Sequence, residues 1–119
     1  MYKIECITTD YFMENIWLIS NQDQDAVLID PGPVAAGILI DFIKDKNCKP
    51  IAIINTHAHP DHIAAAAELQ EYFKISFYLH EKEQTVLKNV NNLATMVGMD
   101  AIKIPEKINW LPSGRLDVG

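Results

Sequence analysis

The sequence is poor in the features that mark several common classes of protein. It has only two cysteines, Cys6 and Cys48, which do not form a C-x-x-C pair. A disulfide framework is therefore not indicated, and we expect both thiols to be reduced and unliganded. Low-complexity segments, internal repeats and Gly/Ser linkers are also missing, which argues against a multidomain array. With 119 residues the chain can bury one modest core, so we expect a single domain over residues 1–119.

Positive charge and long apolar runs are scarce as well. Lys and Arg total 10 against 16 for Asp and Glu, which gives a net charge of −6, and no basic tract is present. This acidic balance argues against nucleic acid and anionic membranes as partners. No apolar run approaches the length of a membrane span, and the first residues lack the apolar region of a signal peptide. We therefore expect a cytoplasmic protein with no nucleic-acid or membrane partner.

Histidine is rare too, but three of the four histidines fall within six positions. His57, His59 and His62 share this segment with Asp61. Imidazole and carboxylate are ligands that Zn²⁺, Fe and Mn accept. In an extended loop His57 and His59 point the same way, whereas Pro60 favours a helix start that would carry Asp61 and His62 in its first turn. The segment predicts one pair of metal ligands from the loop and one from the helix, which suits two adjacent metal positions better than one.

The plainer interpretation of this segment is a solvated, His-rich loop. A short apolar run at residues 51–54 precedes it and an amphipathic pattern follows it, so strand, ligand loop and helix succeed one another as they would in a built site. We therefore favour metal binding. The fourth histidine, His80, stands alone at the end of another apolar run. Because a lone histidine at a strand end is more often structural, we expect no metal role for it.

Several motifs together resemble a known family. Residues 56–62 read T-H-A-H-P-D-H and are similar to the T-H-x-H-x-D-H signature of the metallo-β-lactamase superfamily. The D-P-G sequence at residues 30–32 resembles the turn that this superfamily places on a strand next to the ligand loop. Residues 65–69, 80–83 and 116–119 resemble the glyoxalase II-like branch, the hydroxyacylglutathione hydrolases. The resemblance extends along nearly the whole chain.

The resemblance implies a metal-dependent hydrolase that cleaves a small-molecule thioester or ester, with a glutathione thioester as the expected substrate. It implies that His57 and His59 hold one metal and that Asp61 and His62 hold a second, with Zn²⁺ the expected ion and Fe or Mn as alternatives. Asp61 is also expected to orient the attacking water or handle its proton. Asp30 is a candidate to hydrogen-bond a ligand imidazole, although a plain turn aspartate explains it equally well.

Later parts of the family pattern are missing from the sequence. Family members continue into a G-H-T-P-G-like stretch whose histidine completes the first metal site, then a bridging aspartate and a last histidine. No histidine follows His80, and Asp100 and Asp117 do not match the bridging position. Ala64 and Pro33 stand where the family commonly has glycine. The sequence thus resembles a truncated domain, the N-terminal half of such an enzyme, and we expect it to be inactive or weakly active alone.

Alternation of strand and helix predicts an α/β fold. Strands are expected at residues 3–8, 15–19, 26–29, 51–54, 75–79 and 115–118, and helices at 34–46, after the ligand loop, at 83–90 and at 92–99. The first three strands should be antiparallel neighbours, and Trp110 should lie in irregular chain. We expect a mixed β-sheet with helices on one face, corresponding to half of the αββα sandwich that the resemblance implies.

A half-sandwich leaves one apolar sheet face without its natural cover. We therefore expect a homo-oligomer that associates through this face. Two other functions fit the sequence. Persulfide dioxygenases of the same superfamily carry the same H-x-H-x-D-H pattern with a single iron, and metal identity and oxygen consumption would distinguish them. A non-catalytic, self-associating metal-binding half-domain would need no complete ligand set.

Overall fold

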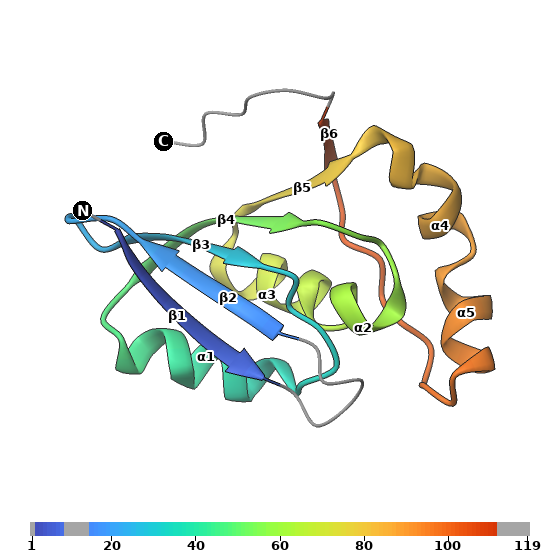
Figure 1. The fold of residues 1–119 in the computed structure, drawn as a ribbon, viewed down its shortest axis with the longest axis horizontal. Helices are drawn as coiled ribbons and strands as arrows, with labels where there is room; N and C mark the ends of the chain where they lie inside the picture. Colours follow the sequence, from blue (N-terminus) through green and yellow to red (C-terminus); the bar gives the residue numbers. More distant parts are fainter. Residues whose placement is uncertain (1, 9–14, 112–119) are drawn as a thin grey trace.

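The computed structural model describes residues 2–8 and 15–111, in which six strands form one sheet in sequence order (Figure 1). The strands are β1 (Lys3–Thr8), β2 (Asn15–Ser20), β3 (Asp25–Ile29), β4 (Lys49–Asn55), β5 (Ser76–His80) and β6 (Ile108–Leu111). The pairs β1–β2 and β2–β3 are antiparallel, as the sequence predicts. The pairs β3–β4, β4–β5 and β5–β6 are parallel. The sheet is therefore mixed, as expected.

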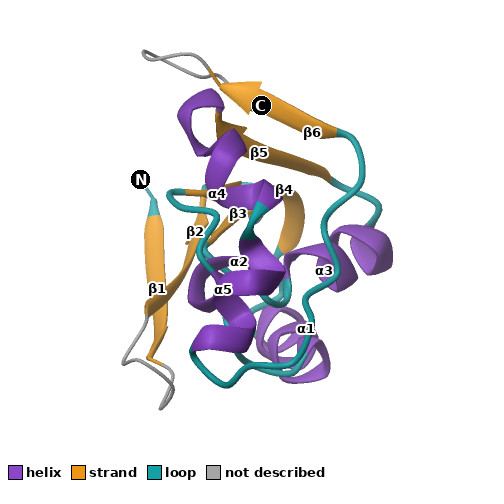
Figure 2. Ribbon diagram, turned by 90° about the vertical axis from the view of Figure 1, so that its right-hand side faces the viewer, coloured by secondary structure: helices purple, strands orange, loops and turns teal. Residues whose placement is uncertain are grey.

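The helices connect and flank the parallel strands. They are α1 (Ala36–Asp45), α2 (Pro60–Ile63), α3 (Ala66–Phe73), the 3-10 turn η1 (Glu81–Glu83), α4 (Gln84–Lys88) and α5 (Val90–Met96). Helices α1, α2 and α3 cover one face of the sheet, and α4 and α5 lie beyond the carboxyl ends of β4 and β5 (Figures 1 and 2). The expected α/β architecture is confirmed. Within residues 2–8 and 15–111, no helix combines the length and the apolar character needed to cross a membrane.

The core lies between the sheet and its helices. Successive residues of a strand face opposite sides, so each strand contributes alternate side chains to this layer. The largest buried side chains are at most 2% exposed and include Ile16, Leu18, Leu28, Leu39, Ile43, Ile53, Ile63, Leu69, Phe77 and Leu79. Burying one such side chain contributes about 1.5–3 kcal/mol. This layer therefore fixes β4, which the candidate ligands follow, and its neighbour β3.

The opposite face of the sheet carries an apolar band, which we call the open face. It comprises Ile4, Trp17, Ile19, Val27, Ile29, Ile54 and Tyr78, whose side chains are all partly or largely exposed. The strand register makes the band continuous, because Ile29 lies opposite Trp17 on one side and Ile54 on the other, and Ile54 lies opposite Tyr78. Ile4 is 62% exposed and Trp17 is 37% exposed.

Two segments differ from the prediction made from the sequence. Trp110 lies in strand β6, opposite Leu79 of β5, and not in irregular chain. The helix expected after the ligand loop is interrupted between Ile63 and Ala66, because the N–H of Ala65 donates to the carbonyl of Pro31 at 3.0 Å. Both differences arise from distant partners that a local pattern does not reveal. The strand expected at residues 115–118 lies outside the described residues.

Candidate metal centre

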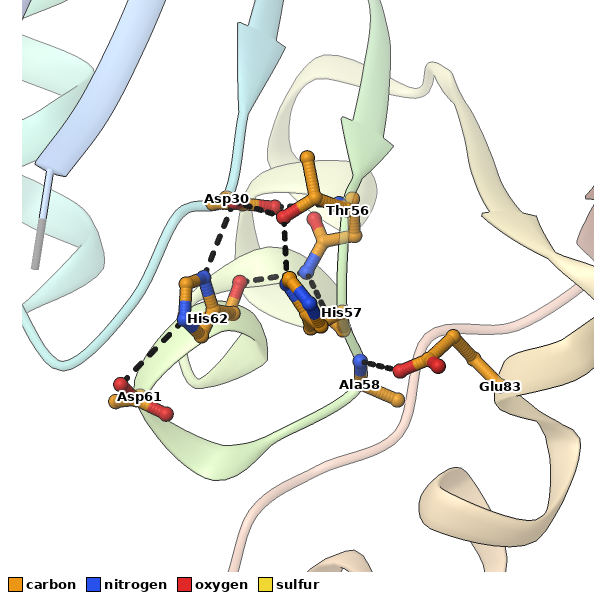
Figure 3. Close-up of polar contacts among 8 residues, drawn as sticks. Asp30, Thr56, His57, Ala58, Asp61, His62 and Glu83 are labelled. Carbon is orange, nitrogen blue, oxygen red and sulfur yellow. Dashed lines mark hydrogen bonds and ion pairs between the residues drawn. The ribbon is translucent and has the colours of Figure 1, made fainter.

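The candidate ligands follow strand β4, and Asp30, which supports them, follows the neighbouring parallel strand β3. Asp30 directly follows β3, and Thr56 and His57 directly follow β4. Because β3 and β4 are hydrogen-bonded neighbours that run in the same direction, the loops after them meet at one edge of the sheet. Figure 3 shows the Asp30 carboxylate directed toward Thr56 and toward His62 of helix α2.

The ligand loop has the local structure that its sequence predicts. His59 has an extended backbone with φ −64° and ψ 151°, and Pro60 is the first residue of α2. Ala58 and Pro60 are buried, whereas His57 and His59 are exposed, as expected for side chains that alternate along an extended segment. The ring centroids of His57 and His59 are 5.6 Å apart, and those of His57 and His62 are 5.1 Å apart. The three imidazoles are therefore close neighbours.

Asp30 is the shared acceptor beneath this loop. It is 5% exposed. Its backbone is left-handed with φ 55°, a conformation that aspartate tolerates better than most residues. The carboxylate accepts hydrogen bonds from the backbone N–H of Thr56 at 2.7 Å, from the Thr56 hydroxyl at 2.5 Å and from Nδ1 of His62 at 3.1 Å. Since a buried carboxylate needs such partners, these bonds tie β3 to the loop and to α2.

These bonds indicate which tautomer each neutral imidazole adopts. A carboxylate only accepts, so Nδ1 of His62 carries the hydrogen that it shares with Asp30. The Thr56 hydroxyl donates its single hydrogen to Asp30, so it accepts the hydrogen of His57 Nδ1, which is 3.0 Å away. In the neutral form of each ring, Nε2 is then the nitrogen with the lone pair. This is the form in which a carboxylate-supported imidazole binds a metal.

The donor atoms are of the kinds that a divalent metal accepts. Oδ2 of Asp61 lies 3.5 Å from Nε2 of His62. Two ligands of one tetrahedral zinc ion lie about 3.4 Å apart when each metal–ligand distance is about 2.0–2.2 Å. However, among residues 2–8 and 15–111 no three His, Cys, Asp or Glu side chains form a group that could hold an ion. The metal-ligand roles of His57, His59, Asp61 and His62, and the catalytic role of Asp61, stay predictions.

His80 makes a structural hydrogen bond at the start of the next element. Its Nδ1 accepts the backbone N–H of Lys82 at 3.0 Å and so caps the 3-10 turn η1. A capping role requires no metal. The expectation that His80 has no metal role stays a prediction.

Two residues that the sequence did not single out also support the loop. Asn55 is buried, and its Nδ2 donates to the carbonyls of His57 at 3.2 Å and His62 at 2.5 Å. The Glu83 carboxylate accepts the backbone N–H of Ala58 at 2.9 Å. A polar residue that closes an apolar strand is a local signal for Asn55. Glu83 has no local signal, since it is 25 positions away from its partner.

Comparison with known proteins identifies relatives over most of the chain. The family model of the metallo-beta-lactamase superfamily matches residues 9–90. The chain is 33% identical over 107 residues to the probable metallo-hydrolase YqgX of Bacillus subtilis, covering 88% of this chain and 50% of that protein. It is 30% identical over 101 residues to the hydroxyacylglutathione hydrolase GloC of Haemophilus influenzae, covering 84% and 47%. The chain thus spans about half the length of these relatives.

Solved structures extend the similarity to the fold. The BLEG-1 B3 metallo-beta-lactamase superposes with a TM-score of 0.84 at 31% identity, over 98% of this chain and 57% of that one. The protein TTHA1623, solved in a di-iron-bound form, gives a TM-score of 0.85 at 30% identity, over 97% and 57%. The expected likeness to half of such a protein is confirmed. Because the family match covers most of its length and solved relatives share its fold, this chain belongs to the metallo-beta-lactamase superfamily.

Proposed function

We propose that this chain supplies part of the metal centre of a metal-dependent hydrolase that cleaves a thioester. The observation that carries the proposal is the shared acceptor Asp30. It orients His62 directly and His57 through Thr56, and it leaves the Nε2 atom of each ring as the nitrogen with the lone pair. A solvated loop would not need two imidazoles oriented by one buried carboxylate.

The proposed roles of the residues are those that the family resemblance implies. A divalent metal at such a centre supplies an activated water near neutral pH and polarises the scissile carbonyl. His57 and His59 would hold one ion, and Asp61 and His62 the other. Asp61 would also orient the nucleophilic water or accept its proton. Zinc is the first candidate, and iron is the second because TTHA1623 was solved in a di-iron-bound form.

A thioester is favoured by the curated relatives. Several of them are named hydroxyacylglutathione hydrolase, among them one at 40% identity over 63 residues from Citrobacter koseri and one at 30% identity over 101 residues from Haemophilus influenzae. The thiolate that leaves a thioester needs little protonation. The reaction therefore makes few demands on a general acid, and none of the candidate residues has to serve as one.

Hydrolysis of S-lactoylglutathione tests the proposal. We expect negligible turnover from the 119-residue chain, even with added Zn²⁺, because the ligand set is incomplete. An in-frame G-H-T-P-G-like stretch after the codon for Gly119 would supply the missing ligands, and we expect the product that includes it to show Zn²⁺-dependent hydrolysis that Asp61→Ala abolishes. Turnover of about 1–10³ s⁻¹ by the 119-residue chain, lost in Asp61→Ala, would mean that a partner chain supplies the missing ligands. Oxygen consumption with a persulfide by the iron-loaded protein would contradict the hydrolase.

A further inference from the structure

The carboxylate of Glu83 lies against the backbone of the ligand loop. Oε1 of Glu83 accepts the N–H of Ala58, the residue between His57 and His59, at 2.9 Å. Figure 3 shows Glu83 approaching Ala58 from the right, whereas Asp30 lies to the left of the loop. Glu83 ends the 3-10 turn η1 and directly precedes α4. The contact therefore connects the segment after β5 with the loop after β4.

This bond and one from Asn55 act on the same peptide group. The carbonyl of His57 accepts from Nδ2 of Asn55 at 3.2 Å, and the N–H of Ala58 donates to Glu83 at 2.9 Å. These two atoms belong to the single planar peptide between His57 and Ala58. Rotation of that plane would change ψ of His57 and φ of Ala58, and with them the direction of the His57 imidazole relative to His59. The peptide is fixed at both of its polar ends.

We propose that Glu83 is a positioning residue for the metal centre, which holds the His57–Ala58 peptide so that the two loop imidazoles share one side of the loop. The inference rests on the proposed function, because it concerns the metal that His57 and His59 would hold. A charged acceptor makes a shorter and stronger hydrogen bond than a neutral one. In this role the Glu83 carboxylate acts on the candidate ligands indirectly, through the peptide group between His57 and Ala58.

Three variants separate a hydrogen bond from a simple charge effect. Glu83→Gln keeps an oxygen acceptor of the same length and loses the charge, whereas Glu83→Asp keeps the charge and loses the reach. Glu81→Ala removes an equal charge from the same 3-10 turn and is the matched control, since Glu81 is exposed. We measure the Zn²⁺ affinity of the 119-residue chain by competition with a chelating dye. If Glu83→Asp binds Zn²⁺ more weakly than Glu83→Gln does, the positioning role is supported. If Glu83→Gln binds Zn²⁺ more weakly than Glu83→Asp does, that role is overturned.

Glu83→Ala should weaken Zn²⁺ binding by about 10–100-fold, the usual effect of losing a residue that orients a metal ligand. Glu81→Ala should leave the affinity unchanged. The amide resonance of Ala58 in the metal-free protein gives an independent measure. It should shift upfield and exchange with solvent faster in Glu83→Ala and Glu83→Asp, but not in Glu83→Gln or Glu81→Ala.

The two measurements distinguish the inference from the proposed function. Unchanged Zn²⁺ affinity in Glu83→Ala, or an Ala58 amide unaffected by that change, would overturn the positioning role while the proposed function stood. A parent chain that binds no Zn²⁺ would contradict the proposed function, whatever the Ala58 amide shows. Should Glu83→Ala fail to fold, the order of Glu83→Gln and Glu83→Asp decides the question alone.

Discussion

At the scale of single residues, the candidate centre depends on a buried carboxylate, Asp30, which is not itself one of the predicted metal ligands. Asp30 connects β3 to Thr56 and to His62 through three hydrogen bonds. Such a bond to a charged group contributes about 1.5–3 kcal/mol, and a buried donor left without an acceptor adds its own desolvation cost. A turn aspartate with no such partners would contribute far less.

Replacing Asp30 should therefore affect both stability and metal binding. In Asp30→Ala the N–H of Thr56 and Nδ1–H of His62 lose their acceptor, and we expect the free energy of unfolding to fall by about 1.5–3 kcal/mol or more. Zn²⁺ affinity should fall by about 10–100-fold. Urea unfolding and Zn²⁺ titration measure the two effects. Asp23→Ala, an exposed position in the turn before β3, is the control, and equal losses there would refute the role of Asp30.

The ligand assignments are tested by removing the imidazoles. After exchange into metal-free buffer and addition of Zn²⁺, elemental analysis should show no more than one loosely held ion per chain, because later family ligands are missing from the sequence. The double variant His57→Ala, His59→Ala should lose most of this binding. His80→Ala should keep it, since His80 caps η1. Two tightly retained ions in a monomer would contradict the incomplete site, and an equal loss in His80→Ala would make that residue a ligand.

At the scale of elements, the helix that carries Asp61 and His62 is only four residues long and depends on neighbours. An isolated helix of this length is not stable in water. Helix α5 contacts α2, and the buried residues Val90 and Ala94 of α5 belong to the main core cluster. Asn91 of α5 in turn accepts the N–H of Ile102 through its Oδ1 at 2.6 Å. This bond fixes the chain that returns toward β6 against α5.

Asn91→Ala tests this support. It leaves the N–H of Ile102, a buried residue, without its acceptor, which should lower the free energy of unfolding by about 1–3 kcal/mol. Asn92→Ala is the matched control. Asn92 is the neighbouring exposed asparagine of the same helix, but it is Asn91 that accepts the N–H of Ile102, so Asn92→Ala should change the free energy of unfolding little. Urea denaturation measures both variants. Equal stability of the two would show that the Asn91 bond contributes nothing measurable.

At the scale of the whole molecule, the open face leaves apolar side chains partly exposed. Its seven residues are apolar or aromatic, and they form a continuous band from β1 to β5. A two-fold interface uses one self-complementary patch twice, and an uncharged band does not repel its own copy. We propose that two chains associate through this band, with a buried area above the roughly 1,000 Å² of a specific interface.

Light scattering at micromolar concentration tests this proposal. The parent chain should be larger than a monomer, and Trp17→Lys should shift it toward the monomer because it places a charge in the band. Ile38→Lys is the control, since Ile38 is 59% exposed but lies on α1, which covers the other face of the sheet. A stable monomeric parent chain that does not bind a hydrophobic dye would refute the proposal.

The sequence by itself determined the local structure of the ligand loop. Pro60 biases His59 to an extended backbone and begins α2, so Asp61 and His62 fall in the first turn. The periodicity of the apolar residues was sufficient for the first three strands and their antiparallel order. These features depend on neighbours within a few positions, which is the range over which backbone preferences and side-chain alternation act.

Only the tertiary structure decided which residues support the site. From the sequence alone, a plain turn explains Asp30 equally well. Its carboxylate is the shared acceptor because β3 lies beside β4, which brings Asp30 to Thr56, 26 positions away, and to His62, 32 positions away. Glu83 and strand β6 likewise depend on the placement of β5 beside β4. Contacts of this kind are selected by the packing of the whole sheet against its helices, and no local pattern encodes them.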